Sequence, residues 1–269
     1  MEHKLKLVGL LRFSVLTPTY YSERFDSLEE IAAHLFSPER MELRFRLFER
    51  LSLPSLLRQS DPDFDMVILT AETLPEVYLQ RLADLLAPHE HLHLLPVGTG
   101  NHYQLLKQGY DLVPTEGFSH RALFRLDDDD ALDREFIART RRLSTSLLEM
   151  QTDAAPFVIA YNRGFYLDLT DPDAPQVIDT CERAPLSAGT TLVAPVGSPM
   201  NPYRYNHRKF AQYFNTYSDI SAPGFIRTIH GDNKSDPAKL GLTHKASEKR
   251  IDKALTQHFG MTLSELKAI

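Results

Sequence analysis

Residues 121–132 read RALFRLDDDDAL, an apolar run that leads directly into four consecutive aspartates. Residues 121–126 are apolar without helical spacing, and this pattern predicts a buried strand. The four carboxylates repel one another, so their place at the end of a buried strand indicates a bound cation. Ligands of open α/β sheets bind beyond the carboxyl ends of the strands. The stretch therefore predicts an α/β fold with a ligand site at residues 127–130.

Asp127 and Asp129 have the spacing to address one ligand together. On a strand their side chains point to the same side, and that of Asp128 points to the other. Carboxylate oxygens are the ligands that Mg²⁺ and Mn²⁺ prefer, and such ions often share their coordination with substrate phosphates. The alternative is a solvated acidic turn that binds nothing. The preceding apolar strand and the helical segment that follows favour the cation site.

Two other cation motifs begin within the same run. An EF-hand loop starting at Asp127 would need glycine at its sixth position and glutamate at its twelfth, where the sequence has Leu132 and Ala138. Asp129 to Asp133 does spell D-D-x-x-D, the diphosphate-Mg²⁺ motif of prenyl-transferring and terpene-forming enzymes. Those proteins are all-helical and carry the motif on a helix, so the strand before it argues against this alternative.

Strands and helices alternate through residues 1–150. This alternation predicts βαβ units and a mainly parallel sheet with right-handed crossovers. Residues 17–38 are polar, aromatic and irregular, which predicts a long loop. The apolar runs predict strands at residues 5–16, 64–71, 91–97 and 121–126. Periodic segments predict helices at residues 39–57, with a kink at Pro54, and at 103–113. Another helix is predicted to begin at a capping box formed by Thr73 and Glu76 and to end just before Pro88. A further helix is predicted to begin at a cap formed by Asp133 and to end at Met150.

Residues 151–269 follow a different, strand-rich pattern. Apolar runs at 157–161 and 165–169 flank Asn162-Arg163-Gly164, which predicts a hairpin. Further strands are predicted at 177–180, 191–196 and 224–230, and helices at 206–214 and 248–259. We expect one domain over residues 1–269, with one continuous sheet and a boundary between its two halves near residue 150.

The composition is that of an ordinary globular protein, with 42% hydrophobic and 25% charged residues among 269. The formal net charge of −6 argues against a broad surface for nucleic acid or anionic membranes. No run approaches the roughly 20 apolar residues of a membrane span, and the N-terminal residues do not resemble a signal peptide. The lone cysteine, Cys181, excludes an internal disulfide. We therefore expect a cytoplasmic protein with no nucleic-acid partner and no integral membrane segment.

The apolar strand ending in D-x-D with a further aspartate resembles the motif of GT-A glycosyltransferases. More narrowly, most of the chain resembles the bacterial family of putative rhamnosyltransferases. The supporting stretches are LRFSVL at 11–16, FRLFERLSLPSLLRQSDPDF at 45–64 and RLDDDDAL at 125–132. The resemblance implies a GT-A-like α/β/α sandwich with a mainly parallel sheet and a smaller antiparallel C-terminal lobe. Residues 1–150 would form its nucleotide-binding half and residues 151–269 its acceptor-binding half.

The resemblance also implies a metal-dependent hexosyltransferase. Such an enzyme moves a sugar, here rhamnose by the family's name, from a nucleotide-sugar donor such as a dTDP-linked one to a hydroxyl of a glycan or small molecule. The implied Mn²⁺ or Mg²⁺ is held by Asp129, with Asp127 and His230 assisting. The implied contacts to the nucleotide sugar are Arg12, Ser14, Arg125, Asp127, Asp128, Asp130 and Lys234.

Residues 228–235 also carry ligand-binding features of their own, apart from the family resemblance. His230 has a ring nitrogen for the cation, Gly231 lets the backbone pass close to a ligand, and Lys234 can pair with a phosphate. The alternative is an ordinary loop with a surface histidine. An inverting transferase also needs a base for the acceptor proton, and Asp219 and His207 are the candidates in the second half of the chain.

Two arginines stand in or beside apolar strands, where a charge needs a partner. Arg12 interrupts the first strand and Arg125 precedes the acidic run, so each either pairs with a carboxylate or contacts a nucleotide. Tyr20, Tyr21 and residues 201–207 suit stacking on sugar rings, although packing within loops explains any one of them more simply. Two functional alternatives stay open, namely a terpenoid or prenyl-diphosphate enzyme and a non-catalytic module that binds sugar nucleotides.

Overall fold

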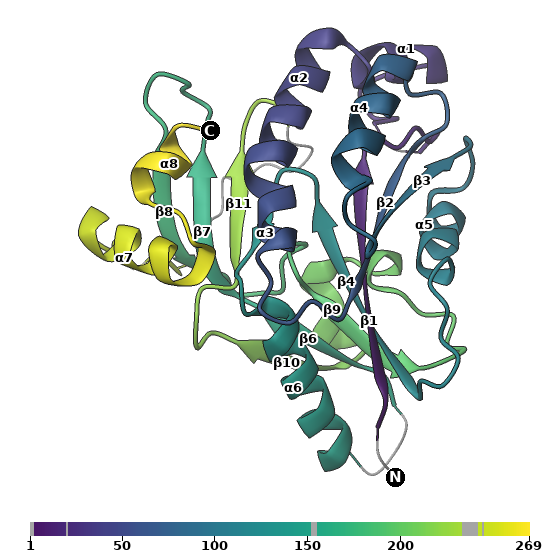
Figure 1. The fold of residues 1–269 in the computed structure, drawn as a ribbon, viewed down its shortest axis with the longest axis vertical. Helices are drawn as coiled ribbons and strands as arrows, with labels where there is room; N and C mark the ends of the chain where they lie inside the picture. The colour runs from purple at the N-terminus through teal and green to yellow at the C-terminus, as the bar shows by residue number, and fades with distance from the viewer. Residues whose placement is uncertain (1–2, 20, 152–154, 233–241, 244) are drawn as a thin grey trace.

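Two β-sheets are joined in the computed structural model, which describes residues 3–19, 21–151, 155–232, 242–243 and 245–269. The larger sheet has seven strands and the smaller has five, counted over these described residues. Figure 1 shows the smaller sheet with α7 and α8 at the left of the view, beside the larger sheet. The α/β class, the larger sheet and the smaller C-terminal lobe are confirmed. The expectation of one continuous sheet is wrong.

The larger sheet is mainly parallel. Neighbours β4-β1-β2-β3 run parallel, as do β10 and β6, whereas β9 is antiparallel to β4 and β6 on either side of it. In sheet order the strands are β10 (Asn215–Asp219), β6 (Phe157–Tyr161), β9 (Thr191–Pro195), β4 (His120–Asp127), β1 (Leu5–Phe13), β2 (Asp65–Ala71) and β3 (Leu92–Val97). The central strands are continuous apolar runs because both of their faces are covered.

Helices cover the two faces of the larger sheet, as in an α/β/α sandwich. Apolar side chains of α2, α3, α4 and α6 share one core with residues such as Leu7, Leu11 and Ile68. On the opposite face, α5 packs on residues such as Val8 and Leu10. The helices of this half are α1 (Leu28–Leu35), α2 (Pro38–Leu47), the π-helical turn η1 (Phe48–Ser52), α3 (Leu53–Leu57), α4 (Glu76–Leu86), α5 (His102–Asp111) and α6 (Phe136–Met150).

The smaller sheet is mixed rather than purely antiparallel, because β7 and β11 run parallel. Its strands in order are β12 (Leu242–Thr243), β8 (Gln176–Cys181), β7 (Arg163–Asp168), β11 (Phe225–Ile229) and β5 (Ala131–Leu132). A separate apolar cluster joins this sheet to α7 (Glu248–Phe259) and α8 (Leu263–Lys267). The short 3-10 segments η2 (Pro202–Arg204) and η3 (His207–Gln212) precede β10.

Among the described residues, the chain crosses between the two sheets several times. β4 ends at Asp127 in the larger sheet, a turn follows, and β5 pairs with β11 in the smaller sheet. The acidic run is therefore the junction between the sheets. Another crossing is at Asn162, where β6 leaves the larger sheet and β7 enters the smaller one. The predicted hairpin of β6 and β7 is consequently wrong, and β7 pairs instead with β8.

Local capping also differs from the sequence predictions. Helix α1 lies inside the predicted loop 17–38, and its Ser27 side chain accepts a hydrogen bond from the Glu30 N–H. The capping box of Thr73 and Glu76 does not form, since α4 begins after Pro75 without a side-chain cap. The cap of α6 is Glu135 rather than Asp133. Strand β10, the two-residue β5 and helix α8 were not predicted.

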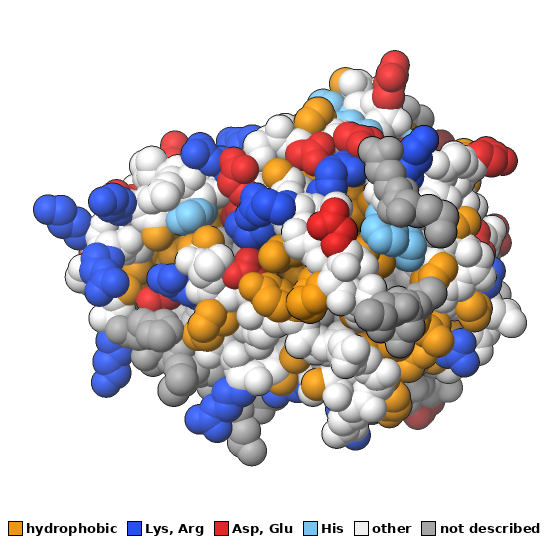
Figure 2. Space-filling view, turned by 90° about the horizontal axis from the view of Figure 1, so that it is seen from below, with side chains coloured by type: hydrophobic (Ala, Val, Ile, Leu, Met, Phe, Trp, Pro, Cys, Tyr) orange, Lys and Arg blue, Asp and Glu red, His pale blue; other side chains and the backbone are white. Residues whose placement is uncertain are grey.

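The surface mixes charges of both signs. On the face seen in Figure 2, acidic and basic side chains are interspersed, with red and blue atoms adjacent near the centre of the view. Among the described residues, no helix combines the length and the apolar character needed to cross a membrane.

Candidate functional site

The register of the two central strands brings the first charged pair together. Arg12 of β1 lies opposite Asp127 of β4 at the carboxyl ends of both strands. Its Nη2 donates to Asp127 Oδ1 over 2.6 Å. An arginine at this place in an apolar strand therefore serves a carboxylate one strand away, and the pair lies where ligands of such sheets bind.

The turn after β4 ends the alternation expected of a strand. The Asp130 N–H donates to the Asp127 carbonyl over 3.1 Å, which closes the turn. The Ser52 hydroxyl of η1 lies 2.8 and 2.6 Å from the carbonyl oxygens of Asp128 and Asp130. A π-helical turn is uncommon and often marks a functional site. Here it places Ser52 against the backbone of the acidic run.

Arg44 of α2 binds the two middle aspartates. Its Nε donates to Asp128 Oδ2 over 2.9 Å, and its Nη2 binds Asp128 Oδ1. Its Nη1 donates to Asp129 Oδ2, also over 2.9 Å. Asp128 and Asp129 therefore share one guanidinium, whereas the sequence predicted that Asp127 and Asp129 would share a ligand.

A chain of polar contacts continues from Asp129 to the end of the described segment. His230 Nε2 lies 2.9 Å from Asp129 Oδ2, and its Nδ1 accepts from the Asp232 N–H over 3.2 Å. Asp232 in turn binds Arg40 Nε over 2.7 Å and His34 Nε2 over 3.0 Å. Because Nδ1 of His230 is an acceptor, this hydrogen-bond network places the ring proton on Nε2, where it donates to Asp129.

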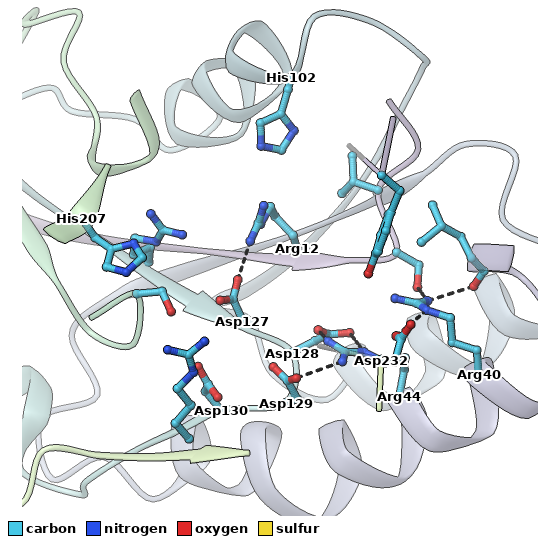
Figure 3. A pocket seen from close by; sticks show the side chains of 17 residues that line it. Arg12, Arg40, Arg44, His102, Asp127, Asp128, Asp129, Asp130, His207 and Asp232 are labelled. Atoms are coloured by element: carbon cyan, nitrogen blue, oxygen red, sulfur yellow. Dashed lines mark hydrogen bonds and ion pairs between the residues drawn. The ribbon is translucent and has the colours of Figure 1, made fainter. Parts of the chain in front are cut away.

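These groups line one cavity of about 280 Å³, which we call the Arg-Asp cavity. Its charged and imidazole side chains are Arg12, Arg40, Arg44, Arg125, Arg227, Asp127, Asp128, Asp129, Asp130, Asp232, His102 and His207. Figure 3 shows His102 and His207 pointing toward the cavity from sides away from Arg44. Five arginines and five aspartates thus face one small space.

An aromatic ring supports two of the arginines. The guanidinium carbons of Arg125 and Arg12 lie 4.2 and 5.0 Å from the ring centroid of Tyr203. The Tyr203 hydroxyl lies 2.9 Å from the Leu10 carbonyl and 3.3 Å from that of Leu126. Cation–π contacts favour this placement of two like charges. Tyr203 is therefore packed beneath the cavity rather than offered to a sugar.

The surroundings move the pKa values of neighbouring carboxyl groups in opposite directions. Burial alone would raise the pKa of Asp127, but Arg12 and Arg125 outweigh it and lower that pKa to about 2. Arg44 and His230 likewise outweigh burial and lower the pKa of Asp129. Burial and the charge of Asp129 raise the pKa of Asp130 well above its usual range. Such divergence between adjacent carboxyl groups is common at functional sites.

His207 lines the cavity as a neutral ring near neutral pH. Burial, followed by the charges of Arg125 and Arg227, lowers its pKa to about 3. A base with so low a pKa accepts a proton poorly near neutral pH. His207 therefore suits hydrogen bonding to a ligand better than proton abstraction.

The sequence-predicted residues divide into three groups. The cavity brings together Arg12, Ser14, Arg125, Asp127, Asp128, Asp129, Asp130 and His207, and His230 contacts it through Asp129. Ser14 has a left-handed backbone φ of 52° and accepts from Arg40 Nη1 over 2.9 Å. Lys234 lies outside the described residues.

The predicted base Asp219 does not line the Arg-Asp cavity. It ends β10 and is 5% exposed, with Oδ2 3.3 Å from Arg139 Nε. Arg139 also binds Asp133, which is fully buried. Asp133, Arg139 and Asp219 form a separate group, here called the buried triad, in which the carboxylate of Asp219 is paired with Arg139.

Several cavity residues were not found from the sequence, namely Arg40, Arg44, His102, Ser187, Arg227 and Asp232. The sequence does hold a signal for the first two. Arg40 and Arg44 are four residues apart on one helix, and each directly precedes an apolar core residue, Met41 or Phe45. Residues four apart lie on the same helix face, so the pair borders the buried stripe.

The predicted metal ligands do not fit a cation in this arrangement. Asp127 is engaged by Arg12, Asp129 by both Arg44 and His230, and the imidazole directs its proton to Asp129. Within the described ranges, no group of three or more His, Cys, Asp or Glu side chains is arranged to hold a metal ion. The binding of Mn²⁺ or Mg²⁺, which the sequence predicted, stays a prediction.

Distant likenesses to solved structures exist at 10% sequence identity. S. aureus TarS 1-349 has a TM-score of 0.43, with 83% of this chain and 60% of that chain covered. Its complex with UDP has the same score, with 96% and 73% covered. A Bacillus anthracis protein named a putative glucose-1-phosphate thymidylyltransferase, in complex with sucrose, has a TM-score of 0.39 with 82% and 88% covered. The chain thus spans 60% of TarS 1-349 in the first comparison and 73% in the second.

A family model gives the direct assignment. No curated protein matches the sequence. The model described as "Putative rhamnosyl transferase" matches residues 6–241, which contain β1, the acidic run, Arg44 and His230. The match covers well over half of the chain, and the chain therefore belongs to this rhamnosyl transferase family.

Proposed function

We propose that the Arg-Asp cavity binds the diphosphate of a nucleotide sugar and that the protein transfers the sugar to a hydroxyl acceptor. Membership of the rhamnosyl transferase family supports the reaction class. The observation that carries the proposal is the gathering of five arginines on one cavity at the carboxyl ends of β1 and β4. Guanidinium groups bind phosphate oxygens with paired, charge-assisted hydrogen bonds.

The arginines also suit the change of charge during transfer. When the bond from the sugar to the diphosphate breaks, negative charge grows on the leaving nucleoside diphosphate. Arg12 and Arg125 are held in advance by Asp127 and by the ring of Tyr203. Fixed donors aimed at developing charge lower the barrier because they need no reorganisation during the reaction.

We infer that Asp130 is the base that accepts the proton of the acceptor hydroxyl. Asp127, Asp128 and Asp129 are each bound by an arginine side chain, whereas the hydrogen bond of Asp130 Oδ1 comes from the Thr228 backbone N–H over 3.3 Å. Asp130 lines the same cavity as the arginines. We therefore assign to Asp130, in place of Asp219, the role of accepting the proton of the attacking hydroxyl.

The finer identity of the substrates follows the family name. Rhamnose from a dTDP-linked donor is the proposed sugar, and a glycan or small-molecule hydroxyl is the proposed acceptor. The terpenoid alternative lacks support, because residues 129–133 lie in a turn and in β5 rather than on a helix. A module that binds sugar nucleotides without transferring them is separated from the enzyme by the experiment below.

The test is a thermal-shift and transfer assay on the full chain. UDP, dTDP and GDP are screened first, followed by their sugar conjugates, with Mn²⁺ and with a chelator. A nucleotide present at 100 times its dissociation constant adds about 2.7 kcal/mol to the free energy of unfolding. We expect one nucleotide series to stabilise the protein, and its sugar conjugate to release the free diphosphate when acceptor is added. No stabilisation by any series would refute the proposal, and binding without transfer across an acceptor screen would favour the module.

A further inference from the structure

The guanidinium of Arg44 lies against Asp129 and His230, two of the three groups that were predicted to hold a divalent ion. Three of its nitrogens contact Asp128 and Asp129, and its Nη1 also lies 3.3 Å from His230 Nε2. The side chains of Arg44, Asp128 and Asp129 are 8%, 3% and 7% exposed. Arg44 therefore contacts two of the three predicted ligands, Asp129 and His230, and its side chain is almost fully withdrawn from water. Figure 3 shows it beside Asp128 and Asp129.

A divalent ion would have to displace these contacts. Mg²⁺ binds oxygen ligands at about 2.0–2.1 Å and needs their lone pairs facing the metal. Asp129 Oδ2 already accepts from Arg44 and from His230. A metal bound there would also lie next to a guanidinium, which keeps its positive charge at any pH a protein tolerates.

The position of Arg44 is fixed by the fold around it. Met41 and Phe45, on the same helix, are fully buried in the main core, so α2 cannot turn without losing that packing. The Ser55 hydroxyl of α3 accepts from the Leu132 N–H over 3.2 Å and ties the far side of the acidic turn to the same helical segment. Moving Arg44 away would leave two buried carboxylates without their partner, which is strongly unfavourable.

We infer that Arg44 takes the place of a divalent cation in this site, so that a nucleoside diphosphate binds to the Arg-Asp cavity without metal. Arg44 offsets one of the two negative charges of Asp128 and Asp129, and four further arginines line the same cavity as the proposed phosphate site. The nucleotide part of this inference rests on the proposed function. The part that concerns the metal rests on Arg44 alone.

The first experiment measures Mn²⁺ binding to the protein without nucleotide. The readout is the EPR signal of free Mn²⁺, which falls as the ion binds. We expect the wild type to take up no stoichiometric Mn²⁺. Arg44→Ala, which removes the cation and leaves the carboxylates, is expected to bind one Mn²⁺ per chain. Arg46→Ala is the matched control, because Arg46 is exposed on the same helix and should leave the protein like the wild type.

Two results would overturn the inference. One is stoichiometric Mn²⁺ uptake by the wild type that Asp129→Asn abolishes. The other is a folded Arg44→Ala variant that binds no Mn²⁺, since Arg44 would then not be what excludes the metal. Circular dichroism reports whether Arg44→Ala folds. If it does not, the wild-type measurement and Asp129→Asn decide the question without it.

The second experiment measures the affinity of the wild type for UDP, dTDP and GDP by calorimetry in EDTA and in Mn²⁺. We expect the dissociation constant of the binding nucleotide to be unchanged by EDTA. A loss of affinity of about tenfold or more in EDTA would contradict the inference. If no nucleotide binds under either condition, the proposed function fails, while Mn²⁺ uptake by the protein alone still judges the role of Arg44.

Discussion

Arg44 and Arg139 are each held by two aspartates and are equally buried, yet they lie in different kinds of places. Arg44 binds Asp128 and Asp129 on the wall of the Arg-Asp cavity. Arg139 binds Asp133 and Asp219 in the buried triad, away from that cavity and 5.0 Å from the ring centroid of Tyr161. Burial and ion pairing therefore do not separate a functional site from a structural one. The two arginines differ in their access to a cavity, because Arg44 lines the Arg-Asp cavity and Arg139 does not.

The largest expected effect contrasts Asp130 with Asp219. Asp130→Asn should lower kcat about 10²–10⁴-fold, the usual contribution of a group that accepts a proton in the transition state. Its affinity for the nucleotide should change little. The measurement is single-turnover transfer alongside nucleotide titration.

Asp219→Asn is the matched change in the buried triad. It should leave kcat near the wild-type value at temperatures well below its melting point. If Asp219→Asn removed transfer while Asp130→Asn did not, the assignment of the two carboxylates would be reversed.

The next largest effect is a loss of folding stability when the buried triad is broken. Arg139→Met leaves Asp133 and Asp219 buried without their shared cation, and breaking a buried pair in this way costs about 3–5 kcal/mol. Urea denaturation measures the loss in the free energy of unfolding. Arg142→Ala, an exposed change on the same helix, should cost less than about 0.5 kcal/mol. Equal losses for both variants would show that the triad does not stabilise the fold.

The pH dependence of stability reports the same triad. Burial raises the pKa of Asp133 to about 6 despite the opposing charge of Arg139. The folded state therefore keeps a proton that the unfolded state loses near pH 4, so this contribution to stability is complete below pH 4 and is lost as pH rises to about 6. A full one-proton difference corresponds to about 1.4 kcal/mol per pH unit.

Urea titrations at pH 4, 5, 6 and 7 measure this slope. Asp127, whose pKa is lowered to about 2, acts in the opposite direction and only below about pH 4. The two contributions thus fall in separate pH windows. Asp133→Asn should remove the contribution of Asp133, so that stability changes with pH between 4 and 6 differently from the wild type. The raised pKa of Asp130 and the lowered pKa of His207 act in both proteins alike, so identical pH dependence of the two proteins would contradict the assignment.

The smallest expected effect concerns the cavity. Arg12→Gln removes a charged donor at the carboxyl end of β1, and hydrogen bonds to charged groups contribute about 1.5–3 kcal/mol. The affinity for the nucleotide should fall about 10- to 100-fold, while stability changes less than in Arg139→Met. Lys6→Gln is the control on the same strand, because Lys6 pairs with Asp65 at the other end. Equal affinities for the two variants would place the phosphates elsewhere.

The parts of the fold that follow from continuous apolar runs could be predicted from the sequence. The four parallel strands were found because strands covered on both faces need apolar residues throughout. The same property misled the interpretation of β6 and β7. Both are continuously buried, so their pattern carries no information about which sheet each one joins, and Asn162 reads as a turn although it is a crossing between sheets.

The candidate site was predicted only where its residues adjoin strands. Asp127 and Arg12 are found because charges interrupt or end apolar runs. Arg44 lies on a helix, where arginine is a common exposed residue, and its burial depends on a turn that lies 84 residues further along the chain. Asp219 was predicted as a site residue but pairs with Arg139 instead. The sequence around Asp219 gives no sign of this pairing, because Arg139 lies far away along the chain.

Tyr203 ties the second half of the chain to the first. It lies beneath Arg12 and Arg125 and bonds to carbonyl oxygens of β1 and β4, while β9 covers the edge of β4. A fragment ending near residue 150 would expose β4 as an edge strand, open to intermolecular pairing, and would let the two guanidinium groups drift apart. The first half of the chain thus contains Arg12 and Arg125, but it needs Tyr203 from the second half to hold their guanidinium groups in place.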